Sequence, residues 1–179
     1  MTSRTQEAQW VLRAQVGDRE AIAALLGAVQ PMLTRYVRAI VGAADAEDVS
    51  QDVMVLIYRK LWMLTEPDLF RPWMYRIASR AAFQYLQKRR RWPSHLRDDE
   101  ALDELPAQDL AAINPRVDEL LQDPRVTPAS RAVLALHFKE EMTLAEVAAV
   151  LDLPIGTVKS RLAYGLATLR RHHTGENHD

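Results

Sequence analysis

Apolar residues recur every three or four positions along most of the chain, which is the spacing of an amphipathic α-helix. The strict alternation of apolar and polar residues that marks a half-buried strand is absent, and glycine and proline fall between the helical stretches. The sequence therefore predicts an all-α fold. In the first half of the chain, the predicted helices cover residues 5–16, 19–29, 31–41, 44–64 and 71–91.

Residues with special backbone properties stand at the ends of these predicted helices. Gly17 suits the end of the first helix, and Asp18 suits the N-cap of the second. Pro31 and Pro72 suit first turns, because proline lacks the N–H group that a first turn leaves unpaired. Gly42 is expected to end the helix that begins at Pro31.

The helix predicted over residues 44–64 has two distinct faces when it is projected at 100° per residue. One face is apolar and is expected to pack inward: Val49, Val53, Leu56, Ile57 and Leu61. The other is expected to be exposed: Asp48, Gln51, Asp52, Val55 and Arg59. The acids on the exposed face form either a docking surface for a basic partner or ordinary solvated helix surface.

The chain changes character between about residue 93 and residue 128, where it becomes acidic and rich in proline. This composition predicts a linker, with one or two helical turns over residues 117–121. Further helices are expected over residues 127–139, 143–151 and 154–171. The predicted organisation is two helical domains, residues 1–92 and 127–179, joined by an acidic flexible linker, residues 93–126.

The last two predicted helices have the form of a helix-turn-helix. Thr143 and Glu146 have the spacing of a capping box at the start of the first. In the second, five apolar residues are expected to pack inward: Ile155, Val158, Leu162, Leu166 and Leu169. The outward residues are small, hydrogen-bonding or cationic: Gly156, Thr157, Lys159, Ser160, Arg161 and Tyr164. Such a face suits the major groove of DNA, although an ordinary amphipathic hairpin has a similar pattern.

The net charge of −1 conceals two opposite blocks of charge. Residues 69–97 contain eight basic and no acidic residues, whereas residues 98–123 contain one basic and nine acidic residues. Aromatic residues are interleaved with the basic block, a composition that suits single-stranded or melted DNA. The alternative is that the aromatic rings belong to the core and that the cations form a solvated helix end.

Composition excludes several other kinds of function. The chain has no cysteine, so it contains no disulfide, cysteine-ligated metal or thiol nucleophile. Its five histidines do not form the spacings of a metal site, and a glycine-rich phosphate loop is absent. We therefore expect no enzymatic activity, no cofactor and no metal. The chain also lacks a signal peptide and a membrane span, so we expect a cytoplasmic protein without membrane insertion.

Three motifs in order resemble the extracytoplasmic-function (ECF) group of bacterial RNA polymerase sigma factors. Residues 45–52, DAEDVSQD, are similar to the DAEDxxQ signature of region two, and residues 70–78, FRPWMYRIA, are similar to its FxxWLYRIA signature. Residues 143–148 and 153–162, TLAEVA and LPIGTVKSRL, are similar to region four. The resemblance covers roughly residues 8–171.

The resemblance implies a subunit that directs core RNA polymerase to promoters and melts them, with an anti-sigma factor as a further partner. It implies an interface with the β′ coiled coil of core polymerase through Glu47, Asp48, Gln51 and Asp52, and it names the β subunit as a further partner. Residues 65–70 correspond to a loop that captures a flipped base of the −10 element. The implied −10 residues are Asp68, Phe70, Arg76, Arg80, Gln84, Lys88, Arg89 and Arg90. Region four would read the −35 duplex through the outward residues of the helix-turn-helix.

Two other functions remain open at the level of sequence. A stand-alone helix-turn-helix regulator would bind a duplex operator as a dimer and would need no acidic docking helix. A helical adaptor without DNA binding would carry the basic block only as solvated surface.

Overall fold

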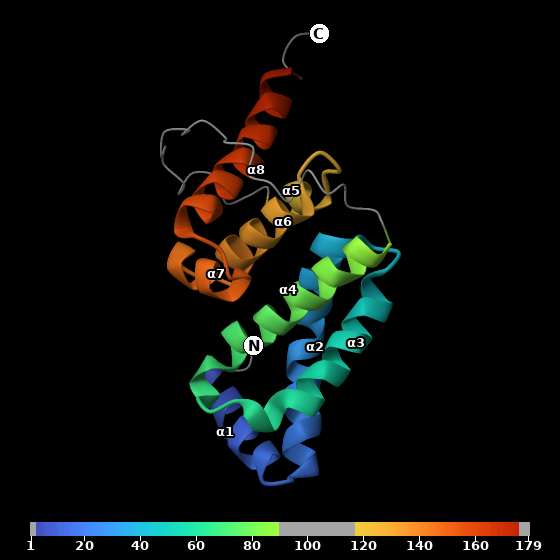
Figure 1. Ribbon diagram of the computed structural model, residues 1–179, viewed down its shortest axis with the longest axis vertical. Helices are drawn as coiled ribbons and strands as arrows, with labels where there is room; N and C mark the ends of the chain where they lie inside the picture. Colours follow the sequence, from blue (N-terminus) through green and yellow to red (C-terminus); the bar gives the residue numbers. More distant parts are fainter. Residues whose placement is uncertain (1–2, 90–116, 176–179) are drawn as a thin grey trace. The chain divides into compact units, whose positions relative to one another are not determined.

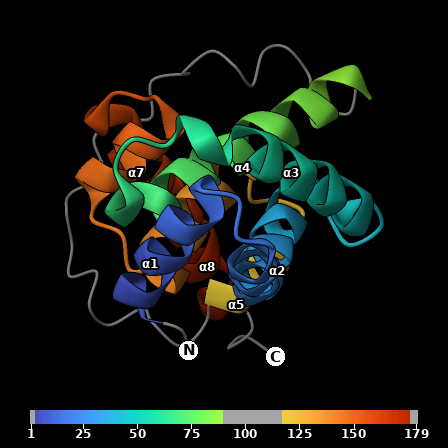
Figure 2. The same cartoon turned by 90° about the horizontal axis from the view of Figure 1, so that it is seen from below.

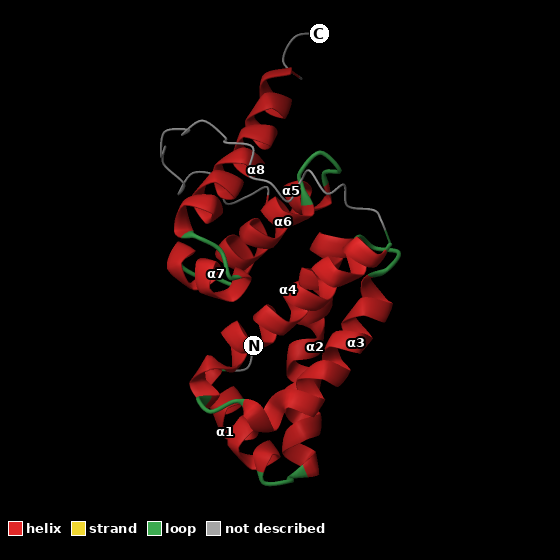
Figure 3. Cartoon of the chain, in the orientation of Figure 1, coloured by secondary structure: helices red, strands yellow, loops and turns green. Residues whose placement is uncertain are grey.

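The computed structural model describes residues 3–89 and 117–175, and within these two ranges all regular structure is helical (Figures 1 and 3). This confirms the predicted all-α fold. The chain divides into two compact units, Met1–Tyr85 and Leu86–Asp179. The expected boundaries at residues 92 and 126 stay predictions, and most of the expected acidic linker lies outside the described residues.

The N-terminal unit is a bundle in which α2, α3 and α4 run side by side and α1 packs against α2 (Figure 1). Two short 3-10 helices, η1 and η2, lie between α3 and α4. The elements are α1 (Arg4–Gln15), α2 (Arg19–Val41), α3 (Ala46–Lys60), η1 (Leu61–Met63), η2 (Pro67–Leu69) and α4 (Phe70–Lys88), whose last three residues follow the boundary at Tyr85.

The turn between α1 and α2 forms as its residues predict. Gly17 has a φ of 92°, a conformation that residues with a side chain rarely adopt. The Asp18 carboxylate accepts hydrogen bonds from the backbone N–H groups of Glu20 and Ala21, at 3.0 and 3.1 Å. These bonds satisfy two donors that the start of α2 would otherwise leave unpaired.

The prediction that a new helix begins at Pro31 is wrong, because α2 continues through this residue to Val41. Pro31 lies on the exposed side of the helix. The buried side is an unbroken row that includes Leu25, Val29, Leu33 and Val37. Burial of that row along the whole helix outweighs the cost of one missing hydrogen bond.

Two tyrosines join α2 to α4 in the core of this unit. The rings of Tyr36 and Tyr75 meet edge to face, with centroids 5.0 Å apart. The Tyr36 hydroxyl and the Ser79 Oγ share a hydrogen bond of 2.6 Å, and Ser79 also donates to the Tyr75 carbonyl. The buried hydroxyls of Tyr36 and Ser79 therefore have partners, as burial of a polar group requires.

The C-terminal unit packs α6 and α7 against α8, with α5 also in contact with α6 and α8. Its elements are α5 (Val117–Gln122), α6 (Pro128–Leu134), the π-helical turn η5 (Ala135–Lys139), α7 (Leu144–Leu151) and α8 (Ile155–Gly175). Residues 117–126 differ from the expected flexible linker. Val117, Leu121 and Val126 are buried, so this segment is part of the packed unit.

The predicted capping box is present at the start of α7. The Thr143 Oγ1 accepts from the Glu146 backbone N–H at 3.2 Å, and the Glu146 carboxylate accepts from the Thr143 N–H at 2.7 Å. After α7, Asp152 adopts a left-handed conformation with a φ of 58°. The chain then turns into α8, and the two helices form the predicted helix-turn-helix.

One inward residue of the predicted recognition helix is misplaced. Val158, Leu162 and Leu166 are buried as expected, but Ile155 is 48% exposed. Ile155 is the first residue of α8. The side chain of Leu169 lies outside what the structure describes.

Candidate functional site

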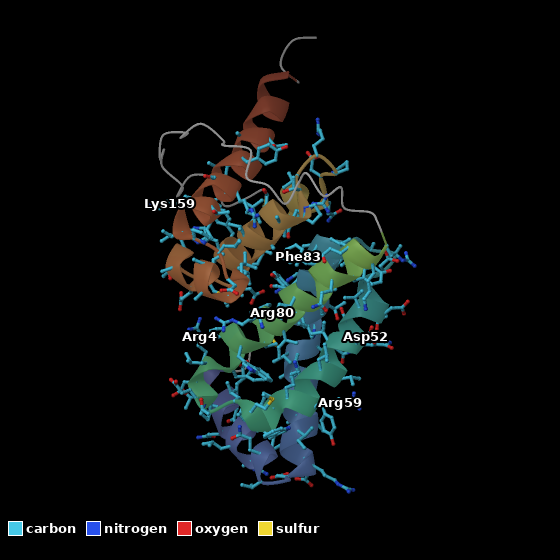
Figure 4. All side chains as sticks on the ribbon, in the orientation of Figure 1. Arg4, Asp52, Arg59, Arg80, Phe83 and Lys159 are labelled. Carbon is cyan, nitrogen blue, oxygen red and sulfur yellow. The ribbon has the colours of Figure 1, made fainter. Side chains whose placement is uncertain are left out.

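An acidic face opens α3, formed by Glu47, Asp48, Gln51 and Asp52. All four side chains are exposed, and Asp52 lies on the outer edge of the unit in Figure 4. Acidic side chains are favoured here, because the unpaired N–H groups of a helix start carry partial positive charge. The structure therefore brings all four predicted residues onto one accessible surface.

An apolar strip that the sequence analysis did not identify extends the acidic face along α3 into η1. Its members are more than half exposed: Val55, Tyr58, Trp62 and Met63. The Trp62 indole N–H donates to the Arg59 carbonyl at 2.8 Å, so the ring is held while 73% of the residue is exposed. The signal was present in the sequence, since residues 55, 58 and 62 continue the spacing of the exposed face.

A basic stripe runs along α4. Arg76, Arg80 and Gln84 are exposed at intervals of four residues, which places them on one side of the helix. Phe83 lies beside them and is half-buried; Figure 4 labels Arg80 and Phe83. Lys88 and Arg89 are exposed at the end of the helix, whereas Arg90 falls outside the described residues.

Phe70 does not belong to the DNA-facing set, which corrects the sequence prediction. The residue is 1% exposed, and its ring packs near Trp73, with centroids 6.1 Å apart. A ring buried in this way cannot contact a nucleotide. Phe70 instead anchors the start of α4.

Residues 65–70, which are predicted to meet the −10 element and which we call the −10 loop, begin after the buried Leu64 and end at the buried Phe70. Asp68 is exposed in it, as are its neighbours Glu66 and Leu69. The loop is not irregular throughout, because η2 forms a single turn in which the Leu69 N–H donates to the Glu66 carbonyl at 2.9 Å.

Two polar residues of α1 hold the chain on either side of this loop. The Glu7 carboxylate accepts two hydrogen bonds from the Arg71 guanidinium, both of 2.8 Å. The Gln15 amide donates to the carbonyls of Leu61 and Leu64, at 2.9 and 2.7 Å. Sequence analysis missed both residues, since their partners lie 64, 46 and 49 positions away.

The outward face of α8 begins directly after the turn at Asp152. Gly156 and Lys159 are exposed, and Thr157, Ser160 and Arg161 are half-buried; Lys159 is labelled in Figure 4. A Cβ atom added to Gly156 would meet nothing within 4 Å, so the backbone here is open to a close approach. Small residues followed by cations at a helix start suit a helix that enters the major groove.

Tyr164 differs from the other members of the predicted −35 set. Its side chain is half-buried, and its hydroxyl donates to the Arg125 carbonyl at 3.4 Å. Tyr164 thus connects α8 to the turn before α6. Its contact with DNA stays a prediction.

The half-buried charge of Arg131 has a structural role in the C-terminal unit. Burial lowers the pKa of Arg131, whose guanidinium donates to the Asp123 carbonyl at 3.0 Å. Within residues 3–89 and 117–175, no three histidine or acidic side chains gather as metal ligands. No helix in these ranges is both long and apolar enough to cross a membrane.

Two protein-family models match the chain. Sigma-70 region 2 matches residues 25–92, which include α3, the −10 loop and the basic stripe. Sigma-70, region 4 matches residues 124–171, which include the helix-turn-helix. Together they account for most of the chain, in the order expected from the sequence motifs.

Similar proteins agree with this assignment over nearly the full length. The RNA polymerase sigma-H factor of Pseudomonas aeruginosa and the ECF RNA polymerase sigma-E factor of Escherichia coli K12 are each 28% identical, over 90% of this chain and 91% of theirs. The fold is similar to that of CnrH, solved in complex with the cytosolic domain of CnrY, with a TM-score of 0.65 and 23% identity over 96% of this chain and 99% of the other. The chain therefore belongs to the sigma-70 family, as an ECF RNA polymerase sigma factor.

Proposed function

We propose that the N-terminal unit binds core polymerase through α3 and the melted −10 element through α4, while α8 reads the −35 duplex. The observation that carries this proposal is the opposite charge of two exposed helix faces in one unit. The acidic face on α3 suits a basic protein surface, and the basic stripe on α4 suits the phosphate backbone. One unit can therefore bind protein and DNA at the same time.

On the polymerase side, the acidic face and the apolar strip form one continuous interface. Interfaces of this kind depend on a few aromatic anchors surrounded by polar residues. Trp62 supplies such an anchor, and Asp48 and Asp52 supply the charge. The β′ coiled coil is the partner that the family resemblance implies, with the β subunit as a further contact.

On the DNA side, the two units divide the promoter between them. The basic stripe and the −10 loop would hold the unpaired strand, with a flipped base accepted by the loop. The start of α8 would read base edges of the −35 duplex through Thr157, Lys159, Ser160 and Arg161. The protein would have no catalytic step of its own and would act in the cytoplasm, where polymerase and DNA are found.

A protein inhibitor is a further proposed partner. CnrH is solved with the cytosolic domain of CnrY bound, and we extend a partner of this kind to the present chain. Such an anti-sigma factor would cover the same exposed faces that meet polymerase.

The test is the affinity of the purified chain for core polymerase, compared with that of Asp48→Lys/Asp52→Lys. Juxtaposed like charges cost several kcal/mol, so binding should fall below detection. Thermal unfolding should change only by the small loss of favourable charge at the start of α3, a loss that Glu20→Lys also makes at the start of α2. Glu20→Lys is the matched control, because Glu20 is an exposed acid of the same unit on another helix, α2. Equal affinity of the double variant and the control would refute the assignment of α3.

A further inference from the structure

The strongest unassigned feature of the chain is the pair of polar clamps that α1 applies to the segment between α3 and α4. Helix α1 contacts both η1 and η2, and Figure 2 shows the linking segment beside it. The segment matched by the region 2 family model begins at residue 25, so α1 lies outside it. Glu7 and Gln15 therefore belong to a part of the chain outside this match, whereas their partners Leu61, Leu64 and Arg71 lie within it.

The first clamp holds the beginning of the −10 loop. Leu61 and Leu64 follow the end of α3, and the Leu61 carbonyl already accepts from the Leu64 N–H at 3.2 Å in the turn of η1. Gln15 donates one hydrogen bond to each of these carbonyls, at 2.9 and 2.7 Å. A glutamine amide has two N–H donors, so both are used on this one turn.

The second clamp holds the end of the loop. The Arg71 guanidinium donates through Nε and Nη2 to the two carboxylate oxygens of Glu7, in a parallel pair of 2.8 Å bonds. The side chains of Arg71 and Glu7 are only 16% and 3% exposed. A paired geometry of this kind fixes direction as well as distance, and low solvent access keeps it from being screened.

Between the clamps, the path of the chain is further fixed by the hydrogen-bonded turn of η2 and by its contact with α1, but most of its side chains face solvent. Thr65, Glu66, Asp68 and Leu69 are all exposed, and Pro67 is half-buried. Glu7 and Gln15 are eight residues apart, or roughly 12 Å along a helix axis. A single rigid helix thus sets the separation of both ends of the loop.

We infer that Gln15 and Glu7 are positioning residues for base selection at the −10 element, acting through the loop that they hold. This inference rests on the proposed function of the loop. Selectivity for a flipped base depends on the shape of the pocket that receives it, and a small displacement of the supporting groups changes that shape. Helix α1 then determines promoter choice without touching DNA.

The experiment measures base preference position by position. Core polymerase with the full-length chain transcribes a pool of promoters whose −10 positions are randomised, and the transcribed templates are sequenced. Gln15→Glu keeps the shape of the side chain but replaces both donors with acceptors. We expect base ratios at the position read by the loop to change by at least roughly two- to tenfold, the range that each of the two lost hydrogen bonds gives. Preferences at the −35 element should not change.

The matched control is Gln9→Glu, which makes the same substitution at an exposed glutamine of the same helix. Its base ratios should equal those of the wild type. A uniform loss of transcription by Gln15→Glu, with unchanged base ratios, would show a merely structural role and would overturn the inference. Should this variant fail to fold, Glu7→Gln makes the test at the other clamp, and unchanged ratios there are equally decisive.

Failure of the proposed function itself would give a different result. In that case the wild-type holoenzyme would show no base preference within the −10 region at all. A base preference that is present in the wild type and altered in Gln15→Glu therefore supports both the proposed function of the loop and the inference about α1. A wild-type preference that the clamp variants keep overturns only the inference about α1.

Discussion

On the surfaces proposed to bind DNA, the N-terminal unit exposes arginines along the side of α4, whereas the C-terminal unit exposes a lysine at the beginning of α8. Along α4, Arg76 and Arg80 stand beside the half-buried aromatic ring of Phe83. At the start of α8, Lys159 follows the open backbone of Gly156. Positive charge alone does not distinguish melted from duplex DNA, so the neighbouring residues carry the difference. An aromatic ring such as that of Phe83 suits stacking on unpaired bases, and a residue without a side chain at a helix start, such as Gly156, suits entry into a groove.

The largest expected effect tests whether the two units unfold independently of each other. Leu33→Ala removes a fully buried side chain of α2 and should cost about 2–5 kcal/mol of unfolding free energy. Amide hydrogen exchange of the full-length chain should show α1–α4 less protected and α6–α8 unchanged. Leu12→Ala is the control, since Leu12 is 55% exposed. Equal loss of protection in both units would show that they unfold together.

The next effect concerns duplex reading by the C-terminal unit. Arg161→Ala should weaken use of the −35 element by about 1–3 kcal/mol if the guanidinium meets a base edge, and it should relax preference at one position. The measurement is transcription from promoters with single substitutions in that element. Arg125→Ala serves for comparison, because Arg125 is exposed in the same unit but lies before α6. Equal losses from the two variants would argue against base reading by α8.

A smaller effect, on the salt dependence of binding, tests whether the basic stripe contacts phosphate groups. For single strands, each phosphate contact contributes roughly 0.7 to the slope of log affinity against log salt concentration. Arg76→Ala/Arg80→Ala should therefore reduce this slope by about 1.4 when the holoenzyme binds a single-stranded −10 probe. Arg38→Ala on α2 changes an exposed arginine of the same unit and should leave the slope unchanged. An unchanged slope in the double variant would remove α4 from the DNA-binding surface.

The smallest effect is a pH dependence confined to the N-terminal unit. Hydrogen bonds from the Ala21 N–H and from Arg13 lower the pKa of Asp18 below its ordinary 3.8. A lowered pKa in the folded state adds stability above the ordinary value, and this stability is lost as the pH falls through the folded value. Asp18→Asn keeps an N-cap but does not titrate. Its stability deficit should shrink on acidification below about pH 4 in denaturant titrations. A constant deficit would contradict this account.

Local patterns predicted the acidic face of α3 and the cap of α7, because each depends on residues within one or two turns of the chain. The same local reasoning failed at Pro31, where burial along the whole of α2 decides the outcome. It also failed at Phe70, whose motif gave no sign that the ring is buried. Local reasoning could not predict the clamps of Glu7 and Gln15, because their partners are distant in sequence. The partners of Gln15 follow the end of α3, and the partner of Glu7 lies in the first turn of α4.

Transcription of sheared genomic DNA by core polymerase, with and without this chain, tests the central claim most directly. Sequencing of the transcripts should reveal new start sites that share paired −35 and −10 motifs. Those sites should disappear with Asp48→Lys/Asp52→Lys and persist with Glu20→Lys. Absence of new start sites, on core polymerase that another sigma factor activates, would contradict the account. Tight binding of promoter duplex by the isolated chain would then identify a stand-alone regulator instead.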